Sequence, residues 1–434
     1  MTGYGADSLK KVIVVAPHFP PSGLAGVHRS RLFAQHLPEF GWEPIIVSVK
    51  PEQYEEHPDA NLLKLLPHGL RVEHVGAIPI RPVRFVGDVG IRGFVPMLRR
   101  ILRIIDREPV DFLYIPIPSF YAALLGPLVK RMRGVPYGID YIDPWVYTPT
   151  GRENLKAKVS LGVARLLEPA AVGGASLITG VAERYYLPVL ERNPELHRQA
   201  VIAAMPYGGE PADHQRLKTL GIEPYLFRGG PARFRMVYAG ALLPRAFEPL
   251  ERMCAAIARD RDLFADVEIY FIGTGTSPDD GKGYNVKAAA ERHGLWETVI
   301  REHPARIPYL DTLAHLEASD AVFVLGSTEP HYTPSKVFQG ILSGKPVFAV
   351  LHSASTACAI LRETNAGIVL DFDGEADVAR IESSFAEAFR RFRTFAAAYE
   401  PGQVDMAAFE PYTARRVTAI LAAALDEAYS RSHA

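Results

Sequence analysis

The sequence predicts an α/β protein with two Rossmann-like domains that face each other across a cleft. Short, continuous apolar runs alternate with helical patterns along most of the 434 residues. The alternation breaks once, in a stretch rich in Gly and Pro near residues 205–230, and then begins again over a similar length. Continuous apolar runs are typical of parallel strands that helices cover on both faces. We therefore expect a parallel sheet in each half of the chain.

The first half opens with a βαβ pattern. Lys11–Pro17 is a continuous apolar run, a glycine-containing loop follows, and a helical pattern covers Val27–Phe40 before a strand at Pro44–Val49. Parallel strands need such helical crossovers between them. Further strands are expected at Arg71–Val75, Phe112–Ile115, Tyr137–Ile142 and Ser176–Thr179, and further helices at Phe120–Arg133 and Leu155–Leu167.

The second half repeats this pattern, and ligands of such sheets bind at the carboxyl ends of the strands. Its expected strands are Phe234–Ala239, Val267–Ile272, a short one from Val299, Ala321–Leu325, Pro346–Val350 and Gly367–Leu370. Its expected helices are Pro249–Arg259, Tyr309–Ala318 and Ser335–Leu342, followed by an amphipathic one at Tyr412–Tyr429. We expect a first domain at residues 1–210, a linker at 211–232, a second domain at 233–411, and a helix at 412–434 that returns to the first domain.

Composition and charge narrow the classes of function. The formal net charge is −1, so no overall field attracts nucleic acid, and we expect no nucleic-acid partner. Cys254 and Cys358 match no metal-binding spacing, and Asp279-Asp280 lies in a Gly-rich loop, so we expect no metal site and no cofactor. No apolar stretch approaches the ~20 residues of a membrane span, and the apolar run near the N-terminus is short for a signal peptide. A cytoplasmic protein is expected.

One basic segment has two interpretations. Residues Arg92–Arg107 read RGFVPMLRRILRIIDR, which has the pattern of a basic amphipathic helix after Pro96. Such a helix can lie on anionic lipid and hold a protein peripherally at the inner face of a membrane. The other interpretation is an ordinary helix that covers the sheet and turns its arginines toward water. We favour this second interpretation.

Several motifs carry a resemblance to a known family. TPSKVFQGILSGKPVFAV (Thr333–Val350) and RIPYLDTLAHLEASDAVFVL (Arg306–Leu325) resemble segments of the retaining nucleotide-sugar glycosyltransferases with two Rossmann domains, the GT-B fold of the glycosyl transferase group 1 or family 4 type. APHFPPSGLAGVHRSRLFAQHLPEFGWEPIIVS, DYIDPW, VYAGALLPRAFEPL and IYFIGTG also occur in the family's order. The resemblance covers most of the chain. It implies transfer of a sugar from a nucleotide diphosphate sugar to a hydroxyl group, with retention and without a metal ion.

The resemblance implies a binding site for the donor diphosphate in the second half. Pro334-Ser335-Lys336 opens a predicted helix, and both helix amides and an ammonium stabilise phosphate charge. The family assigns this region to the diphosphate, and Arg245 resembles its basic residue in the first loop of that domain. Small residues at strand ends let the backbone approach a ligand closely. These glycines are Gly23, Gly26 and Gly273.

Two positions of the donor site depart from the family pattern. The carboxylate that usually holds the ribose hydroxyls falls at Gln339, whose amide can exchange hydrogen bonds without charge assistance. The glutamate that usually faces the donor sugar falls at His331, with Glu329 two residues before it. Glu329 and His331 are therefore the candidate catalytic residues on this side. Ile307 is positioned, by the same resemblance, to present its backbone to the nucleotide base.

The first half supplies the candidate acceptor residues. Asp143 follows a strand end, where a carboxylate can orient or deprotonate an acceptor hydroxyl, and it is the third catalytic candidate. Asp140 and Trp145 are expected to bind the acceptor, the tryptophan through a sugar-stacking face, and His18 lies near the glycine loop. The simpler alternative for either aspartate is a turn or helix-capping residue.

The expected reaction is front-face attack of an acceptor hydroxyl on the donor, with the leaving phosphate helping to take its proton. This mechanism depends on positioning and charge stabilisation more than on a protein nucleophile. The resemblance to the family also implies the acceptor, which is a saccharide or a lipid-linked saccharide in bacterial-type polysaccharide, lipopolysaccharide or glycolipid assembly. Two alternatives stay open: a sugar-nucleotide epimerase on the same scaffold, and a sugar-nucleotide-binding protein with weakened catalysis.

Overall fold

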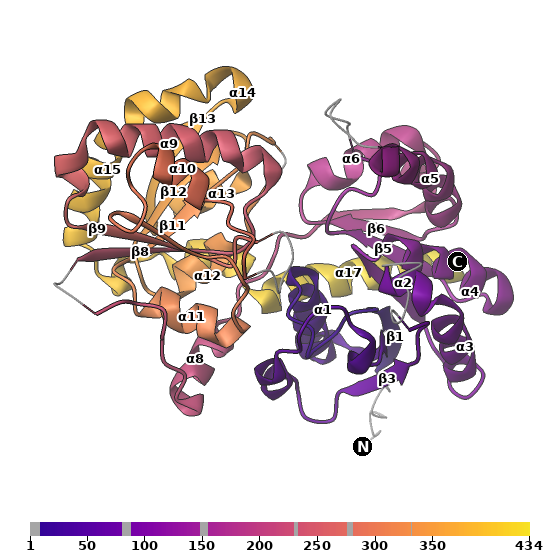
Figure 1. Ribbon diagram of the computed structural model, residues 1–434. Helices are drawn as coiled ribbons and strands as arrows, with labels where there is room; N and C mark the ends of the chain where they lie inside the picture. The colour runs from indigo at the N-terminus through magenta and orange to yellow at the C-terminus, as the bar shows by residue number, and fades with distance from the viewer. Residues whose placement is uncertain (1–8, 80–87, 148–154, 230–232, 276–280, 331) are drawn as a thin grey trace. The chain divides into compact units, whose positions relative to one another are not determined.

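The chain divides into two compact units. The computed structural model describes residues 9–79, 88–147, 155–229, 233–275, 281–330 and 332–434 (Figure 1). The first unit consists of Met1–Tyr207 together with Ala414–Ala434, and the second consists of Gly208–Thr413. Each unit contains one parallel sheet covered by helices. These are two Rossmann-like domains, as the alternation of strands and helices predicts.

The first unit contains a seven-stranded parallel sheet in the order β3-β2-β1-β4-β5-β6-β7. The strands are β1 (Lys10–Val15), β2 (Trp42–Val49), β3 (Arg71–Val75), β4 (Phe112–Ile117), β5 (Tyr137–Tyr141), β6 (Leu177–Gly180) and β7 (Val201–Ala204). The inner strand β1 pairs on both sides, since Val14 lies opposite Ile46 of β2 and opposite Tyr114 of β4. Helices cover both faces of this strand, which is why its sequence is continuously apolar.

Helices from distant parts of the chain cover the two faces of this sheet. Residues of α3 to α6 belong to one apolar core, and residues of α1 and α17 belong to the core on the other face. The helices are α1 (Ala25–His36), α2 (Val89–Arg92), α3 (Phe94–Ile105), α4 (Leu125–Arg133), α5 (Leu155–Val172), α6 (Glu183–Arg192), α7 (Leu196–Gln199) and α17 (Ala414–His433). Short 3₁₀ turns are η1 (Leu37–Phe40), η2 (Pro51–Gln53), η3 (Ala60–Leu65) and η4 (Phe120–Leu124).

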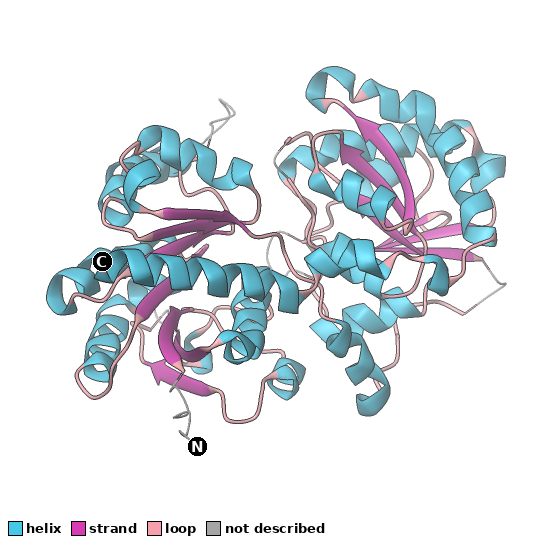
Figure 2. Ribbon diagram, turned by 180° about the vertical axis from the view of Figure 1, so that it is seen from behind, coloured by secondary structure: helices cyan, strands magenta, loops and turns pink. Residues whose placement is uncertain are grey.

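Helix α17 completes the first unit with residues from the end of the sequence. Val417, Leu421 and Leu425 repeat at helical spacing and are buried. They join the core that contains residues of α1, and α17 packs against α1 and β7. Figure 2 shows this helix lying along the sheet. The apolar side of this amphipathic helix therefore packs against the first sheet.

The second unit contains a six-stranded parallel sheet in the order β10-β9-β8-β11-β12-β13. The strands are β8 (Phe234–Ala239), β9 (Val267–Ile272), β10 (Ile300–His303), β11 (Ala321–Leu325), β12 (Val347–His352) and β13 (Gly367–Phe372). The helices are α8 (Pro211–Leu220), α9 (Phe247–Arg259), α10 (Lys287–Arg292), α11 (Tyr309–Glu317), α12 (Lys336–Leu342), α13 (Thr356–Glu363), α14 (Gly374–Asp377), α15 (Ala379–Ala397) and α16 (Met406–Phe409). The 3₁₀ turns are η5 (Pro244–Ala246), η6 (Arg261–Phe264), η7 (Pro401–Gln403) and η8 (Glu410–Tyr412).

The segment expected as a linker, residues 211–232, contains a helix. Helix α8 begins at Pro211, and the Glu210 side chain accepts a hydrogen bond from the Ala212 N–H, so the helix has both a favourable first residue and an N-cap. This helix packs against α11 and belongs to the second unit. Its few apolar residues are enough for one-sided packing, which explains why the segment resembles a loop in sequence.

The basic segment Arg92–Arg107 forms two helices rather than one. The break is at Gly93, where a Cβ atom would lie 2.6 Å from Cγ2 of Val49, so only glycine fits between α2 and α3. Arg92 is buried and donates hydrogen bonds to the carbonyl oxygens of Ile78 and Gln53. The helix expected after Pro96 lies within α3, whereas Arg92 ends the separate helix α2. No helix among the described residues is long and apolar enough to cross a bilayer.

Candidate functional site

Lys336 lies at the carboxyl edge of the second sheet. It is the first residue of α12, and its Nζ atom is buried although part of the residue is exposed. This Nζ has no hydrogen-bond partner among the described residues and lies 3.7 Å from the centre of the Tyr238 ring. Burial lowers the pKa of the amine to about 7. The strand β8 thus places an aromatic ring beneath a cation that has no counter-ion in the described part of the chain.

Two glycines at strand ends bring the backbone close to this cation. Gly240 follows β8 with a φ of 121°, and a Cβ atom there would lie 3.3 Å from Nζ of Lys336. Gly273 follows β9 with a φ of 74°, and its Cβ would lie 3.6 Å from Cγ of Arg306 and 3.9 Å from the Gly240 Cα. Both φ values favour glycine. The ends of β8 and β9 therefore meet near two basic residues, Lys336 and Arg306.

Arg245 and Glu329, both predicted site residues, form an ion pair in the same unit. Nε of Arg245 lies 3.8 Å from Oε1 of Glu329, and Nη1 lies 3.5 Å from Oε1 of Glu375. The Ser327 hydroxyl donates to Oε2 of Glu329 at 3.4 Å. Arg245 is about one-third exposed. The guanidinium is thus shared between two carboxylates and remains accessible to solvent. The other catalytic candidate of this half, His331, lies outside the described residues.

Gln339 contacts a buried histidine that the sequence did not suggest. Nε2 of His214, on α8, lies 3.1 Å from Oε1 of Gln339, and Nδ1 lies 2.7 Å from Oε1 of Glu317 on α11. Both partner atoms accept hydrogen bonds, so a neutral imidazole can donate to only one of them. Either His214 is an imidazolium, or the Gln339 amide is turned to present its NH₂. In both cases His214 fixes the orientation of Gln339.

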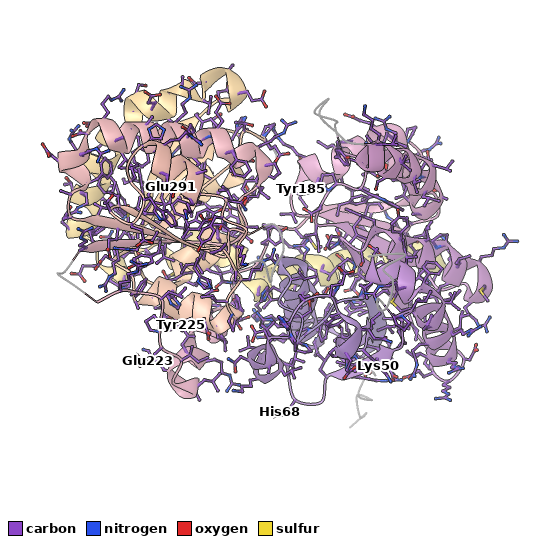
Figure 3. All side chains as sticks on the ribbon, viewed as in Figure 1. Lys50, His68, Tyr185, Glu223, Tyr225 and Glu291 are labelled. Atoms are coloured by element: carbon purple, nitrogen blue, oxygen red, sulfur yellow. The ribbon has the colours of Figure 1, made fainter. Side chains whose placement is uncertain are left out.

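The remaining donor-side predictions lie near α12 and α11. Pro334 is buried and Ser335 is exposed, directly before Lys336. Ser335 adopts helical backbone angles and makes no side-chain capping bond. Ile307 is half-buried in the loop that leads into α11. The segment after α8, which contains Tyr225 (labelled in Figure 3), contacts this helix. The Tyr225 N–H donates a hydrogen bond to Nε2 of His315 at 3.1 Å.

Asp140 has a structural environment rather than an acceptor site. Its carboxylate is buried, and Arg29 donates to both oxygens, over 2.5 Å and 3.0 Å. Thr179 also donates to it at 2.9 Å, and Arg29 reaches the carbonyl oxygen of Pro206 at 3.0 Å. The carboxylate therefore holds α1 against β5 and β6. The expectation that Asp140 binds the acceptor was wrong, because these bonds leave it inside the protein.

Trp145 is likewise part of the core of the first unit. It is 5% exposed, stacks on Phe120 with centroids 5.9 Å apart, and meets Tyr121 edge-on. One face of the indole is thus covered, so it offers no open surface for a sugar, contrary to expectation. Asp143 is exposed in the turn after β5 and has a polar contact of its own. Of the residues that flank this strand end, Asp143 is the one available to a ligand.

The glycine loop and His18 lie near each other in the first unit. A Cβ atom at Gly26 would lie 3.1 Å from Cδ of Pro118, so this glycine permits close packing of α1 on the loop after β4. A Cβ at Gly23 would lie 3.9 Å from that of Asp59, which is ordinary contact. The His18 ring lies 5.0 Å from that of Tyr54, and burial lowers its pKa. His18 is therefore a poor cation at neutral pH.

The described residues contain neither a cluster suited to a metal ion nor a reactive thiol. Among residues 9–79, 88–147, 155–229, 233–275, 281–330 and 332–434, no cluster of three or more His, Cys, Asp or Glu side chains can hold a metal ion. Cys254 and Cys358 are free and buried. Burial raises the pKa of the Cys254 thiol, and it raises that of Cys358 to about 11. Both thiols are therefore inert packing groups.

The comparisons with known proteins agree with this architecture. No family model and no curated protein matches the sequence. Among solved structures, HepE from Anabaena in complex with UDP-glucose is similar over 96% of this chain and 99% of its own, with 16% identity and a TM-score of 0.60. An α,α-trehalose-phosphate synthase (UDP-forming) from Burkholderia vietnamiensis is similar over 97% of this chain and 100% of its own, with 14% identity and a TM-score of 0.62.

The chain has the GT-B fold. A glycosyltransferase from Rickettsia africae gives the same result, with 12% identity, a TM-score of 0.60, and 97% and 98% of the two chains covered. In the GT-B fold described here, the carboxyl edge of the second sheet carries Lys336, Gly240 and Gly273. This is the edge at which ligands of Rossmann-like sheets bind.

Sequence reasoning missed two residues of this site. Tyr238 lies within a buried strand, so its sequence context shows only a core position. His214 lies in a polar stretch that resembles a linker. Gly240, directly after β8, was quoted as part of a motif, but only the backbone angle shows why glycine is required there.

Proposed function

We propose that the chain is a glycosyltransferase that moves a sugar from a nucleoside diphosphate sugar to a hydroxyl group. The GT-B fold supports this proposal, as do neighbours that were solved with UDP and with UDP-glucose. A nucleoside diphosphate sugar is therefore the donor class to test first.

The observation that carries the proposal is the buried Nζ of Lys336. A buried cation without a counter-ion is unfavourable, because it has lost its hydration without gaining a partner. A diphosphate placed at this strand edge supplies that partner, and Gly240 leaves room for the ligand to approach Nζ. The ammonium then also stabilises the charge that grows on the leaving diphosphate in the transition state.

Arg245 supplies a second cation that can move to the donor. In the structure it lies between Glu329 and Glu375, and both ion pairs are 3.5 Å or longer. Pairs of this length at a partly exposed site are weak, so a doubly charged diphosphate competes with them readily. Release of Glu329 from Arg245 would then leave a carboxylate to face the donor sugar. We propose that these protein cations, rather than a metal ion, neutralise the diphosphate.

The nucleotide and the acceptor are assigned by residue type. The Gln339 amide, oriented by His214, can hydrogen-bond a ribose hydroxyl without adding charge next to the phosphates. On the acceptor side, Asp143 is exposed after β5 and is the candidate that orients the attacking hydroxyl. Retention, and a saccharide or lipid-linked saccharide acceptor from polysaccharide, lipopolysaccharide or glycolipid assembly, belong to the same proposal.

A ligand screen tests the donor class directly. The thermal unfolding of the protein is followed in the presence of nucleotides (UDP, GDP, ADP or CMP) and of sugar nucleotides such as UDP-glucose. A ligand that binds the folded state at 100 times its Kd stabilises it by about 2.7 kcal/mol. We expect a diphosphate nucleotide to raise the Tm of the wild type but not that of Lys336→Ala. Lys218→Ala, which removes an exposed lysine of α8, is the control.

Product analysis then separates the reaction classes. A transferase releases the nucleoside diphosphate, slowly by hydrolysis without acceptor and faster with one, and gives a new glycosidic linkage. An epimerase gives an isomerised sugar nucleotide and no free nucleotide, whereas a binding protein gives the thermal shift alone. Either of the latter results, or an unchanged response in Lys336→Ala, rejects the proposed transferase.

A further inference from the structure

Helices α3, α4 and α5 lie side by side on one face of the first unit. Helix α4 packs against both α3 and α5 (Figure 1). Ile101 of α3, Val129 of α4 and Leu161 of α5 point inward and belong to one apolar core. The outward sides of the three helices therefore form one continuous surface, which we call the α3–α5 face.

The charge of these three helices is strongly one-sided. They contain nine Lys or Arg residues and a single acid, Glu168, which gives them a formal net charge of +8 in a chain of net charge −1. Glu168 is buried and paired with Arg192, so it does not contribute to the surface. Asp106 neutralises Arg133, and Glu73 neutralises Arg100.

Five further cations of the face have no acidic partner among the described residues. No ion pair with a described residue involves Arg99, Arg103, Arg131, Lys158 or Arg165, and all five are exposed. Unpaired cations clustered on one face attract anions from a distance of about 10 Å at 0.1 M salt. The face therefore has a positive electrostatic potential that attracts anions, although the net charge of the protein is close to zero.

The same face exposes large apolar side chains. Leu155, Val159 and Leu166 of α5 are 78%, 57% and 76% exposed, and their spacing of four and seven residues places them on one side of the helix. Val95 of α3 and Met132 of α4 are about half exposed. An 18-residue helix that exposes large apolar side chains between its outward cations is typical of a helix with a second partner on that side.

We propose that the α3–α5 face binds the surface of an anionic lipid bilayer. Protruding apolar side chains that insert between headgroups, surrounded by Lys and Arg that contact lipid phosphates, are the chemistry of an interfacial membrane contact. A nucleic acid would match the cations but not the leucines and valine. An acidic protein would need a defined complementary shape, whereas the absence of exposed acids on all three helices suits an extended anionic plane. This inference does not depend on the proposed transferase reaction.

The proposal changes the role of the basic segment Arg92–Arg107. Within that segment, Val95 is the large apolar residue that is exposed, and Arg92 is buried. It supplies positive charge to the face through Arg99 and Arg103. The apolar contact comes mainly from α5, which the sequence pattern did not single out.

Vesicle co-sedimentation of the whole protein tests this proposal. The probes are phosphatidylcholine vesicles and phosphatidylcholine vesicles that contain about one-third phosphatidylglycerol. We expect binding to the anionic vesicles, weakened about tenfold or more when salt rises from about 0.1 M to 1 M. The charge variant Lys158→Gln/Arg165→Gln and the apolar variant Val159→Gln/Leu166→Gln should each bind the anionic vesicles about tenfold more weakly.

Matched controls remove the same groups elsewhere. Lys218→Gln/Arg391→Gln and Met406→Gln change exposed residues of the second unit, and they should bind as the wild type does. Thermal unfolding checks that every variant folds. The proposal is overturned if the wild type does not bind anionic vesicles, or if the α5 variants bind them unchanged. It is also overturned if heparin or nucleic acid binds with similar affinity and the apolar variant keeps that binding, because the occupant is then a soluble polyanion.

A labelled cysteine locates the contact independently. Gly162 lies on the exposed side of α5 with open space around its Cβ position, so Gly162→Cys accepts an environment-sensitive dye. Gly402→Cys, equally open but in the second unit, is the control. The native Cys254 and Cys358 are buried and should not react. Anionic vesicles should shift the emission of the dye at position 162 to the blue but leave that at 402 unchanged. Equal responses at both positions contradict the assignment.

Discussion

The Nζ atom of Lys336 lies 3.7 Å from the centre of the Tyr238 ring and has no hydrogen-bond partner among the described residues. The ring face offers a cation some compensation for lost hydration, but much less than an anion does. The site is therefore arranged for a ligand that brings negative charge. Four of the predictions below follow from this pair of residues or from the groups around it.

Replacement of Lys336 should separate stability from ligand binding. In Lys336→Met the buried charge is gone while most of the side-chain volume stays, so the Tm of the free protein should be equal to or above that of the wild type. Turnover with the donor should fall roughly 100-fold or more, because a group that stabilises transition-state charge is lost. Calorimetry and steady-state kinetics measure the two effects. Lower stability together with unchanged turnover would contradict the role assigned to Lys336.

The same residue should give the stability a distinctive pH dependence. Its pKa is about 7 in the folded protein and about 10.4 in the unfolded chain. Between these values the unfolded state binds more protons, so the free energy of unfolding contributed by this group rises with pH from about 7 to about 10. Urea unfolding at several pH values should show a steeper rise in the wild type than in Lys336→Met. Identical slopes would indicate that the amine is protonated in the folded state throughout.

Donor binding should weaken in the same pH range. A bound diphosphate stabilises the ammonium form of Lys336, so binding is accompanied by proton uptake above pH 7. We expect the Kd for a nucleoside diphosphate to rise with pH, by up to about tenfold per unit, and the dependence to disappear in Lys336→Arg. Isothermal titration in buffers of different ionisation enthalpy measures the proton uptake. A Kd that is constant from pH 7 to 9 would be the contrary result.

Gln339→Glu tests the part played by His214. The new carboxylate would form a charge-assisted bond with the imidazole and could also accept a bond from a ribose hydroxyl. We expect the KM for the donor to fall by about threefold to tenfold, with kcat changed less. His214→Ala should raise KM, because the side chain at position 339 loses its fixed orientation. If His214→Ala lowers stability but leaves KM unchanged, the histidine has only a packing role.

The buried ion pair of Asp140 and Arg29 should behave as a structural element. Asp140→Asn leaves a buried guanidinium without its counter-ion and should destabilise the first unit by about 3–5 kcal/mol. The double variant Arg29→Met/Asp140→Leu should recover part of this loss, since no lone charge remains. Chemical unfolding provides both values. An acceptor-binding role for Asp140 would instead leave stability intact and raise the KM for the acceptor.

The sequence predicts the two sheets well because their evidence is local. Most of the inner strands are continuous apolar runs, such as Val12–Val15, as expected for parallel strands that helices cover on both faces. The start of a helix at Lys336 is equally local, since Pro334 marks it. The GT-B fold was therefore accessible from patterns and motifs in their order along the chain.

The site could be predicted only in part, because it depends on distant partners. Asp140 lies at the end of a strand, and this local context suggests an exposed side chain. Its partner Arg29 is 111 positions away in the sequence, so the local pattern does not show that the carboxylate is buried and paired. The burial of Lys336 results from Tyr238 and Gly240, nearly a hundred positions earlier in the chain. The sequence pattern did not indicate helix α8 for a different reason. A helix that packs against the protein on a single side contains few apolar residues, so its sequence resembles that of a loop.

Helix α17 has a consequence for the order in which the protein is built. The first unit takes residues from both sides of the second, so its sheet emerges from the ribosome long before the helix that covers Trp42 and Tyr114. The second unit is continuous in sequence and can finish folding during that interval. Until Ala414–Ala434 is synthesised, one face of the first sheet is covered by α1 but not by α17, so part of its apolar surface is exposed. Nascent chains stalled before residue 414 should therefore bind chaperones that recognise apolar surface.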